Sequence, residues 1–147
     1  MNPNTKVEDI MTSWTISVQP EDQLPVIQAI FKTHSFHHLP VINDDQKVVG
    51  MISKIDILHF MKQLSQETSG KFFSQKSIAH STAGDIMTTG EIITIAPDDT
   101  VGLAADIFLA NTIHSLPVVE DGKLAGIVTT HDLLKHAFKK VIHDLDE

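Results

Sequence analysis

The chain has 147 residues, of which 41% are hydrophobic and 20% are charged, a size that suits one compact domain or two small ones sharing a core. Cysteine is absent, and this excludes a disulfide framework, a thiolate zinc site and a cysteine nucleophile. The net charge of −8 argues against nucleic-acid binding, and no apolar run approaches the roughly 18 residues that cross a bilayer. We therefore expect a cytoplasmic globular protein that binds neither nucleic acid nor membrane.

The sequence is duplicated. Asp9-Ile10-Met11-Thr12 recurs as Asp85-Ile86-Met87-Thr88, and Leu39-Pro40-Val41 recurs as Leu116-Pro117-Val118. Eighteen identities relate residues 9–58 to residues 85–134, whereas chance matching would give roughly three. The halves are therefore expected to be structural copies.

Each copy predicts a strand, a helix, two further strands and a closing helix. In the first copy these are a β-branched strand at 15–18, a helix capped by Asp22, strands at 39–42 and 48–52, and a helix from Ser53. In the second copy they are a strand at 92–95, a helix capped by Asp99, strands at 116–119 and 124–128, and a helix from Thr129. This order predicts an α+β fold whose halves pack together, because one copy alone buries little surface.

The repeats are predicted at residues 1–62 and 82–147, joined by a linker at 63–81 that is rich in Ser, Gln and Lys. Such a long connection is unusual in a compact domain. Phe72 and Phe73 lie inside it, and they either anchor the linker on a surface or belong to a lid over a ligand.

Three motifs occur in the same order in both copies. They are Asp-Ile-Met-Thr, His-x-Leu-Pro-Val, and Gly-x-x-Ser/Thr-x-x-Asp, the last present as residues 50–56 and 126–132. In this combination the chain resembles the paired CBS-domain module, also called a Bateman module. The resemblance covers nearly the whole chain and implies two strand–helix–strand–strand–helix repeats packed about a pseudo-two-fold axis.

The resemblance implies a cleft between the repeats that binds an adenine nucleotide or a related adenosyl compound as a regulatory ligand. It assigns the ribose hydroxyls to Asp56 and Asp132, and a place near the ribose and phosphates to Ser53 and Thr129. Carboxylates suit this role because they accept two hydrogen bonds from a vicinal diol. Helix N-termini also favour an anion.

The remaining candidate residues surround these two motifs. Flanking residues that could meet a phosphate are Lys54 in the first copy and Thr130 and His131 in the second. Apolar residues expected to line the adenine pockets are Ile16, Leu39, Pro40, Val41, Ile93, Leu116, Pro117 and Val118. The scarcity of cations disfavours a triphosphate and favours AMP, ADP or a less charged adenosyl ligand.

Other interpretations of these motifs remain open. Ser or Thr followed three residues later by Asp is also an ordinary helix-capping arrangement. His34, His37 and His38 suggest a metal site, but His38 directly precedes an extended Leu-Pro pair, so the spacing is not helical. No phosphate loop, nucleophile elbow or zinc-protease motif is present, and we expect no enzyme activity, catalytic cofactor or metal.

We therefore predict a regulatory module that senses adenosyl nucleotides and signals to a separate effector protein. The resemblance also implies a homodimer formed through the closing helices, predicted at 54–62 and 130–141. The alternatives are a ligand-free protein–protein interaction module and, more remotely, a histidine-dependent metalloprotein.

Overall fold

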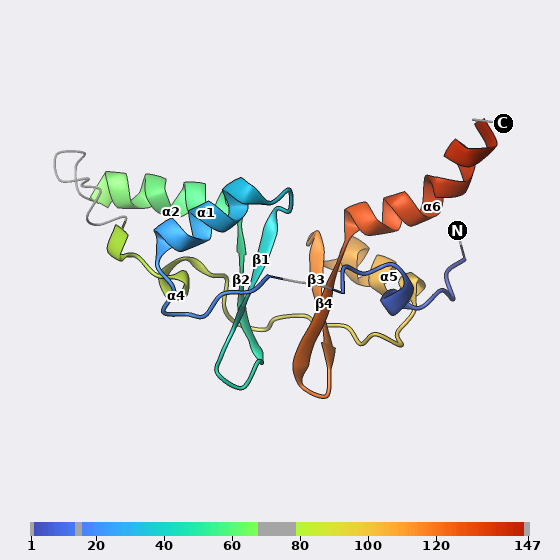
Figure 1. Ribbon diagram of the computed structural model, residues 1–147, viewed down its shortest axis with the longest axis horizontal. Helices are drawn as coiled ribbons and strands as arrows, with labels where there is room; N and C mark the ends of the chain where they lie inside the picture. The colour runs from blue at the N-terminus through green and yellow to red at the C-terminus, as the bar shows by residue number, and fades with distance from the viewer. Residues whose placement is uncertain (1, 14–15, 68–78, 146–147) are drawn as a thin grey trace. The chain divides into compact units, whose positions relative to one another are not determined.

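The computed structural model describes residues 2–13, 16–67 and 79–145 (Figure 1). The chain forms two compact units, each a small antiparallel sheet with helices, so the predicted α+β class is confirmed. We call Ile16–Ile92 the central unit, and Met1–Thr15 with Ile93–Glu147 the terminal unit. No described helix is long and apolar enough to span a membrane.

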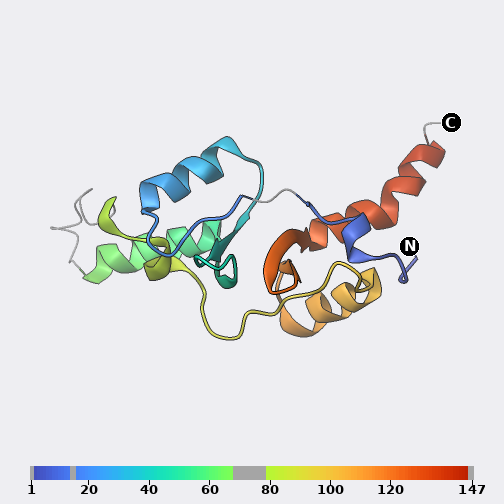
Figure 2. The same ribbon diagram turned by 60° about the horizontal axis from the view of Figure 1, so that its bottom comes forward.

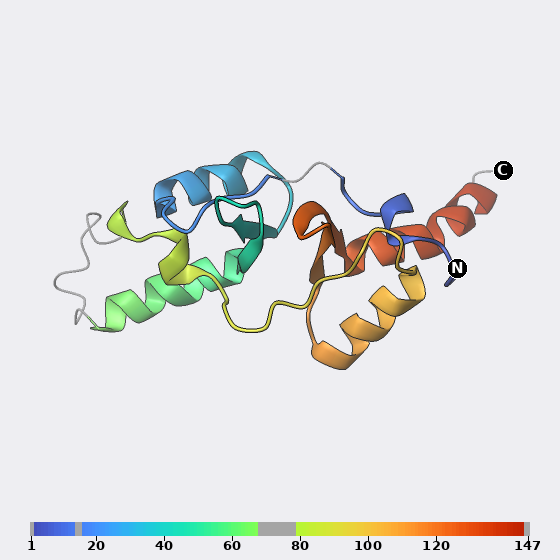
Figure 3. The ribbon, with the colours of Figure 1, turned by 90° about the horizontal axis from the view of Figure 1, so that it is seen from below.

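The central unit is built around one hairpin. Its elements are α1 (Leu24–Thr33), β1 (His38–Ile42), β2 (Val48–Ser53), α2 (Lys54–Glu67) and the short α4 (Ala83–Ile86). β1 and β2 pair antiparallel, and α2 and α4 both contact β2. The core is formed by buried side chains of α1, β1, β2, α2 and α4 together with Val18. The ribbons of these helices and strands are shown in Figure 3.

The terminal unit repeats this plan with equivalent elements. These are the 3-10 turn η1 (Val7–Asp9), α5 (Val101–Asn111), β3 (Ser115–Glu120), β4 (Lys123–Thr129) and α6 (Thr130–Leu145). β3 and β4 pair antiparallel, and α6 packs against both β4 and α5. The two hairpins share the same register, since Leu39 faces Ile52 as Leu116 faces Val128.

The first predicted strand of each copy is reduced to a single bridging residue. Val18 pairs in parallel with Val41, and Ile95 pairs in parallel with Val118. The chain leaves the sheet directly after Val18, because the next backbone N–H bonds to a side chain instead of a strand. The Gln19 N–H donates to Asp22 Oδ2 at 2.8 Å. The Ala96 N–H donates to Asp99 Oδ2 over the same distance.

The prediction that Asp22 and Asp99 are helix N-caps is therefore wrong. Their side chains close the preceding turns, and the N-caps are Gln23 and Thr100. Thr100 caps α5 with its hydroxyl, which accepts from the Leu103 N–H at 3.1 Å.

Each Asp-Ile-Met-Thr segment packs on the hairpin of the other copy. Residues 82–88, from the second copy, lie in the central unit, and the N-terminal segment lies in the terminal unit beside α5 and α6 (Figure 2). Thr88 exchanges backbone hydrogen bonds with Met51, and Thr12 does so with Ile127, each pair adding an edge to the sheet. The compact units therefore do not coincide with the sequence repeats at 1–62 and 82–147.

The residues just before each Asp-Ile-Met-Thr segment cap the first helix of the unit in which the segment lies. The Leu24 N–H at the start of α1 donates to the Ser81 carbonyl at 2.9 Å, and the Val101 N–H at the start of α5 donates to the Thr5 carbonyl at 2.7 Å. These bonds satisfy helix N–H groups that have no partner inside the helix. A backbone partner therefore replaces a side-chain cap at α1, where Gln23 makes no such bond.

The closing helix of the first copy, predicted to end at residue 62, is longer than expected. α2 continues to Glu67, since residues 63–67 are mostly good helix formers. The other end of the predicted linker is docked, because Ser81 is buried and its carbonyl caps α1. Phe72 and Phe73 lie outside the described residues, so the choice between anchor and lid stays open.

Candidate functional site

The Ser53–Asp56 motif forms a reciprocal cap at the start of α2. The Ser53 N–H donates to Asp56 Oδ2 at 2.8 Å, and the Asp56 N–H donates to Ser53 Oγ at 3.0 Å. Both residues are half-buried. The capping interpretation of this motif is therefore correct for the backbone, and it fixes the position of the carboxylate.

The Thr129–Asp132 motif repeats this arrangement at the start of α6 with one addition. The Thr129 N–H donates to Asp132 Oδ2 at 2.9 Å, and the Asp132 N–H donates to Thr129 Oγ1 at 3.1 Å. The Thr129 hydroxyl also donates to Asp132 Oδ2 at 3.0 Å. The same carboxylate oxygen thus accepts two bonds in this unit.

The second oxygen of each carboxylate remains available. Neither Asp56 Oδ1 nor Asp132 Oδ1 accepts a hydrogen bond from any of the described residues. An ionised carboxylate has about four acceptor positions, and the cap uses only some of them. Capping and ligand binding are therefore compatible at both motifs, since one oxygen holds the side chain in place and the other can accept a ligand hydroxyl.

The loop before each hairpin holds the first N–H of the closing helix. The Lys54 N–H donates to the His37 carbonyl at 3.2 Å, and the Thr130 N–H donates to the His114 carbonyl at 3.0 Å. The backbone carbonyls of His37 and His114 therefore hold the start of the closing helices, a role that any residue type could fill. Both imidazoles are exposed.

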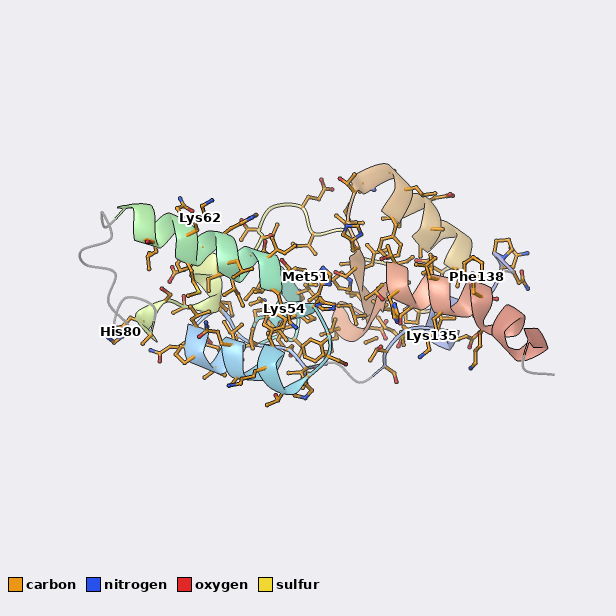
Figure 4. The ribbon with its side chains drawn as sticks, turned by 90° about the horizontal axis from the view of Figure 1, so that it is seen from above. Met51, Lys54, Lys62, His80, Lys135 and Phe138 are labelled. Atoms are coloured by element: carbon orange, nitrogen blue, oxygen red, sulfur yellow. The ribbon has the colours of Figure 1, made fainter. Side chains whose placement is uncertain are left out.

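The structure places the residues that flank the motifs at the helix starts. Lys54 is half-buried in the first turn of α2, three residues after Met51 of β2 (Figure 4). Thr130 holds the equivalent position on α6 and is also half-buried, while His131 is exposed. These three residues remain candidates for contact with a phosphate.

Most of the predicted adenine-pocket residues belong to the cores of the two units. Six of them, all on β1 or β3, are buried: Leu39, Pro40, Val41, Leu116, Pro117 and Val118. Buried side chains shape the sheet from within and expose no apolar surface for a purine. Ile16 and Ile93 are half-buried and do expose part of their side chains, so they are the stronger candidates of the eight.

His38 is a site neighbour that the sequence reasoning missed. In the hairpin register His38 lies directly opposite Ser53, and Ser115 lies opposite Thr129. Opposed residues on one face of an antiparallel pair have Cβ atoms about 4.5–5.5 Å apart. The sequence carries a signal for this pairing, because the length of a hairpin turn fixes which residues of the two strands face each other.

No group of three or more metal-ligating side chains comes together among residues 2–13, 16–67 and 79–145. His34, which the sequence suggested as a ligand, stacks on Phe36 with ring centroids 5.2 Å apart. Its Nδ1 lies 3.0 Å from the Ile30 carbonyl. This position indicates a packing role for His34 at the end of α1.

The fold and the motifs together define a duplicated α+β module whose two copies each present a capped carboxylate at the start of the closing helix. The CBS domain family model matches residues 7–63 and 83–139. The chain therefore belongs to the CBS domain family, and it contains a tandem pair of these domains.

Relatives in Methanocaldococcus jannaschii are similar over most of the chain. An uncharacterized protein, MJ1426, is 31% identical in an alignment 151 positions long that covers 88% of this chain and 89% of that protein. A second uncharacterized protein, MJ1404, is 29% identical over 90% of this chain but only 32% of its own length. An inosine-5'-monophosphate dehydrogenase is 28% identical over 88% of this chain, and the chain spans 23% of that enzyme.

Solved structures of CBS pairs share the fold. CBSX2 in complex with AMP has a TM-score of 0.75 and 26% identity, with 93% of this chain and 98% of that chain covered. The CBS pair of MJ0100 in complex with 5′-methylthioadenosine and S-adenosyl-L-methionine has a TM-score of 0.75 and 29% identity, with 94% and 99% covered.

Proposed function

We propose that this protein is a regulatory module that binds an adenosyl compound at its Gly-x-x-Ser/Thr-x-x-Asp motifs and passes the signal to a partner protein. The observation that carries the proposal is the pair of capped carboxylates, each with one oxygen anchored and the other unoccupied by described residues. The AMP complex of CBSX2 and the adenosyl complexes of MJ0100 support the ligand class.

The chemistry of the carboxylates fits a ribose diol. A ribose presents two adjacent hydroxyl donors, and an ionised carboxylate held at a fixed angle can accept both. The reciprocal cap fixes that angle in advance, so that little conformational entropy is lost on binding. We infer that Asp56 and Asp132 contact ribose, that Ser53 and Thr129 lie near the 5′ substituent, and that Ile16 and Ile93 contact the base.

Catalysis is not part of this proposal. Some relatives of the chain are enzymes, including inosine-5'-monophosphate dehydrogenases and homoserine O-acetyltransferases, but the matched residues cover about a quarter of each. We infer that the matched part has a regulatory role in this chain.

Calorimetric titration of AMP and 5′-methylthioadenosine tests the ligand. We expect binding by the parent chain and a tenfold to hundredfold weaker affinity at a site whose Asp is changed to Asn, because a charged acceptor is lost while the cap keeps an oxygen. Thermal unfolding of Asp56→Asn and Asp132→Asn serves as the control for folding. If both variants bind the two ligands with the affinity of the parent chain, the carboxylates serve only as helix caps.

We also propose a homodimer formed through the helices. Exposed apolar side chains recur at equivalent positions of the two units: Val26 and Leu103 on α1 and α5, and Leu58 and Leu134 on α2 and α6. Leu58 is 65% exposed and Leu134 58% exposed. Because both units expose apolar side chains at these equivalent helix positions, we infer that a second copy of the chain covers this face.

The second candidate function is a protein–protein interaction module without a ligand. The complete capping boxes favour this alternative, since they give both motifs a structural purpose. Thermal shifts with AMP, ADP, ATP, NAD, S-adenosylmethionine and divalent metals separate the candidates, because a ligand that binds only the folded state raises its stability.

A further inference from the structure

We infer that the two motif sites accept ligands of different charge. The Ser53–Asp56 site takes an adenosyl ligand that carries a 5′-phosphate, and the Thr129–Asp132 site takes one whose 5′ substituent carries no negative charge. This inference rests on the proposed function and assigns a ligand class to each site. Two differences between the motifs carry it, one at the hydroxyl residue and one at the residue that follows it.

The first difference is the hydroxyl hydrogen. The Thr129 hydroxyl donates to Asp132 Oδ2 at 3.0 Å while it accepts from the Asp132 N–H. The Ser53 hydroxyl accepts from the Asp56 N–H in the same way, but it donates to no acceptor among the described residues. Its hydrogen is thus free for a ligand oxygen, whereas the hydrogen of Thr129 is already used.

The second difference is the residue that follows the hydroxyl. Lys54 is half-buried in the first turn of α2 and forms no ion pair with a residue that the structure describes (Figure 4). Thr130 takes its place on α6 and carries no charge. The first lysine of α6, Lys135, lies more than one turn further along the helix and is exposed.

The two differences act in the same direction. A phosphate gains from a hydroxyl donor and an ammonium group, and hydrogen bonds to charged groups are stronger than those between neutral groups. At the terminal site an anion would meet a hydroxyl oxygen whose hydrogen points to Asp132, beside the negative charge of that residue. A thioether or another uncharged group avoids this repulsion.

Exchanging the differing residues between the sites tests the inference. S53T/K54T gives the central unit the residues of the terminal unit, and T129S/T130K does the reverse, so both variants keep a side chain known to form the cap. Titrations with AMP and with 5′-methylthioadenosine are compared with those of the parent chain, with thermal unfolding as the check on folding.

We expect S53T/K54T to weaken the AMP affinity about tenfold while the affinity for 5′-methylthioadenosine stays within about twofold. T129S/T130K should raise the amount of AMP bound per chain. Equal losses for both ligands, or an unchanged AMP affinity in S53T/K54T, would overturn the division of ligands. If the parent chain binds neither compound, the proposed adenosyl function itself fails.

Discussion

The side chain of Met87 lies directly over Gly50, on β2 of the central unit. A β-carbon at Gly50 would come within 2.5 Å of the Met87 sulfur. The terminal unit repeats the relationship, where a β-carbon at Gly126 would lie 2.9 Å from the Met11 sulfur and 2.6 Å from the Thr12 carbonyl oxygen. Both glycines therefore permit the close approach of an Asp-Ile-Met-Thr segment that comes from the other sequence repeat.

We predict that Gly126→Ala destabilises the protein more than Gly50→Ala does. The methyl group at Gly126 meets a backbone oxygen that is hydrogen-bonded to the Ile127 N–H at 3.1 Å, whereas at Gly50 it meets a flexible side chain. Overpacking of this kind costs about 1–3 kcal/mol of unfolding free energy. Denaturant unfolding of the two variants measures the difference.

Gly84→Ala is the matched control, because a β-carbon there would have no neighbour nearer than the Pro20 carbonyl oxygen at 3.4 Å. Met87→Ala should also rescue Gly50→Ala in part, since it removes the atoms that collide. Equal stability of Gly126→Ala and Gly84→Ala would contradict the close packing of the Met11–Thr12 segment on Gly126.

A fragment of residues 16–92 should fold alone, and a fragment of residues 1–81 should not. The first fragment contains the α4 segment, including the fully buried Ala83 and the Thr88–Met51 hydrogen bonds. The second contains the whole first sequence repeat but lacks these groups, and it leaves the N-terminal segment without α5 to pack on. Far-ultraviolet circular dichroism during thermal unfolding distinguishes the fragments, and a cooperative transition in 1–81 alone would refute the prediction.

Asp132→Ala should lower the unfolding free energy more than Asp56→Ala. Loss of a capping residue costs about 0.5–2 kcal/mol, and Asp132 additionally accepts a bond from the Thr129 hydroxyl. Asp132→Asn should recover much of the loss because the amide oxygen can still accept from the Thr129 N–H. The comparison requires chemical denaturation without ligand, and a larger effect of Asp56→Ala would show that the extra bond contributes nothing.

The parent chain should have a mass of about 32 kDa in solution, twice the 16.2 kDa of one chain. Leu58→Glu and Leu134→Glu should each shift it toward the monomer, because an apolar side chain is replaced by a charge at the proposed dimer face. Leu109→Glu is the control: Leu109 is 84% exposed, but its equivalent on α1 is Lys32, so it is not part of the recurring apolar pair. Light scattering at micromolar concentration reads the mass, and a monomeric parent would contradict the dimer.

Local patterns in the sequence predicted the hairpins and the starts of the closing helices. Leu39-Pro40-Val41 and its copy are strands as expected, and α2 and α6 begin directly after Ser53 and Thr129. The capped carboxylates at Asp56 and Asp132 follow from the three-residue spacing alone. These features succeed because their interacting residues lie within a few positions of one another.

Features that depend on distant residues were not predictable in this way. Each Asp-Ile-Met-Thr segment packs on the hairpin of the other sequence repeat, so that Thr12 pairs with Ile127. A periodicity of 2 or 3.6 residues predicts local strands and helices but not a pairing between residues so far apart. The turns closed by Asp22 and Asp99 were misread as helix caps because an aspartate two residues before a helix serves either purpose. Burial of Val41 and Val118 likewise depends on helices that lie far from them in the sequence, so the strand pattern alone does not predict it.

The packing of each Asp-Ile-Met-Thr segment on the other sequence repeat also implies an order in which the two units fold during synthesis. All residues of the central unit are present once the chain has grown to Ile92, and domains generally fold as units while synthesis proceeds from the N-terminus. Val7, which is made before the central unit, is fully buried in the core of the terminal unit, whose β3 and β4 are made after residue 114. The segment that carries Val7 therefore completes its packing only after β3 and β4 are made, by which time every residue of the central unit is available to fold.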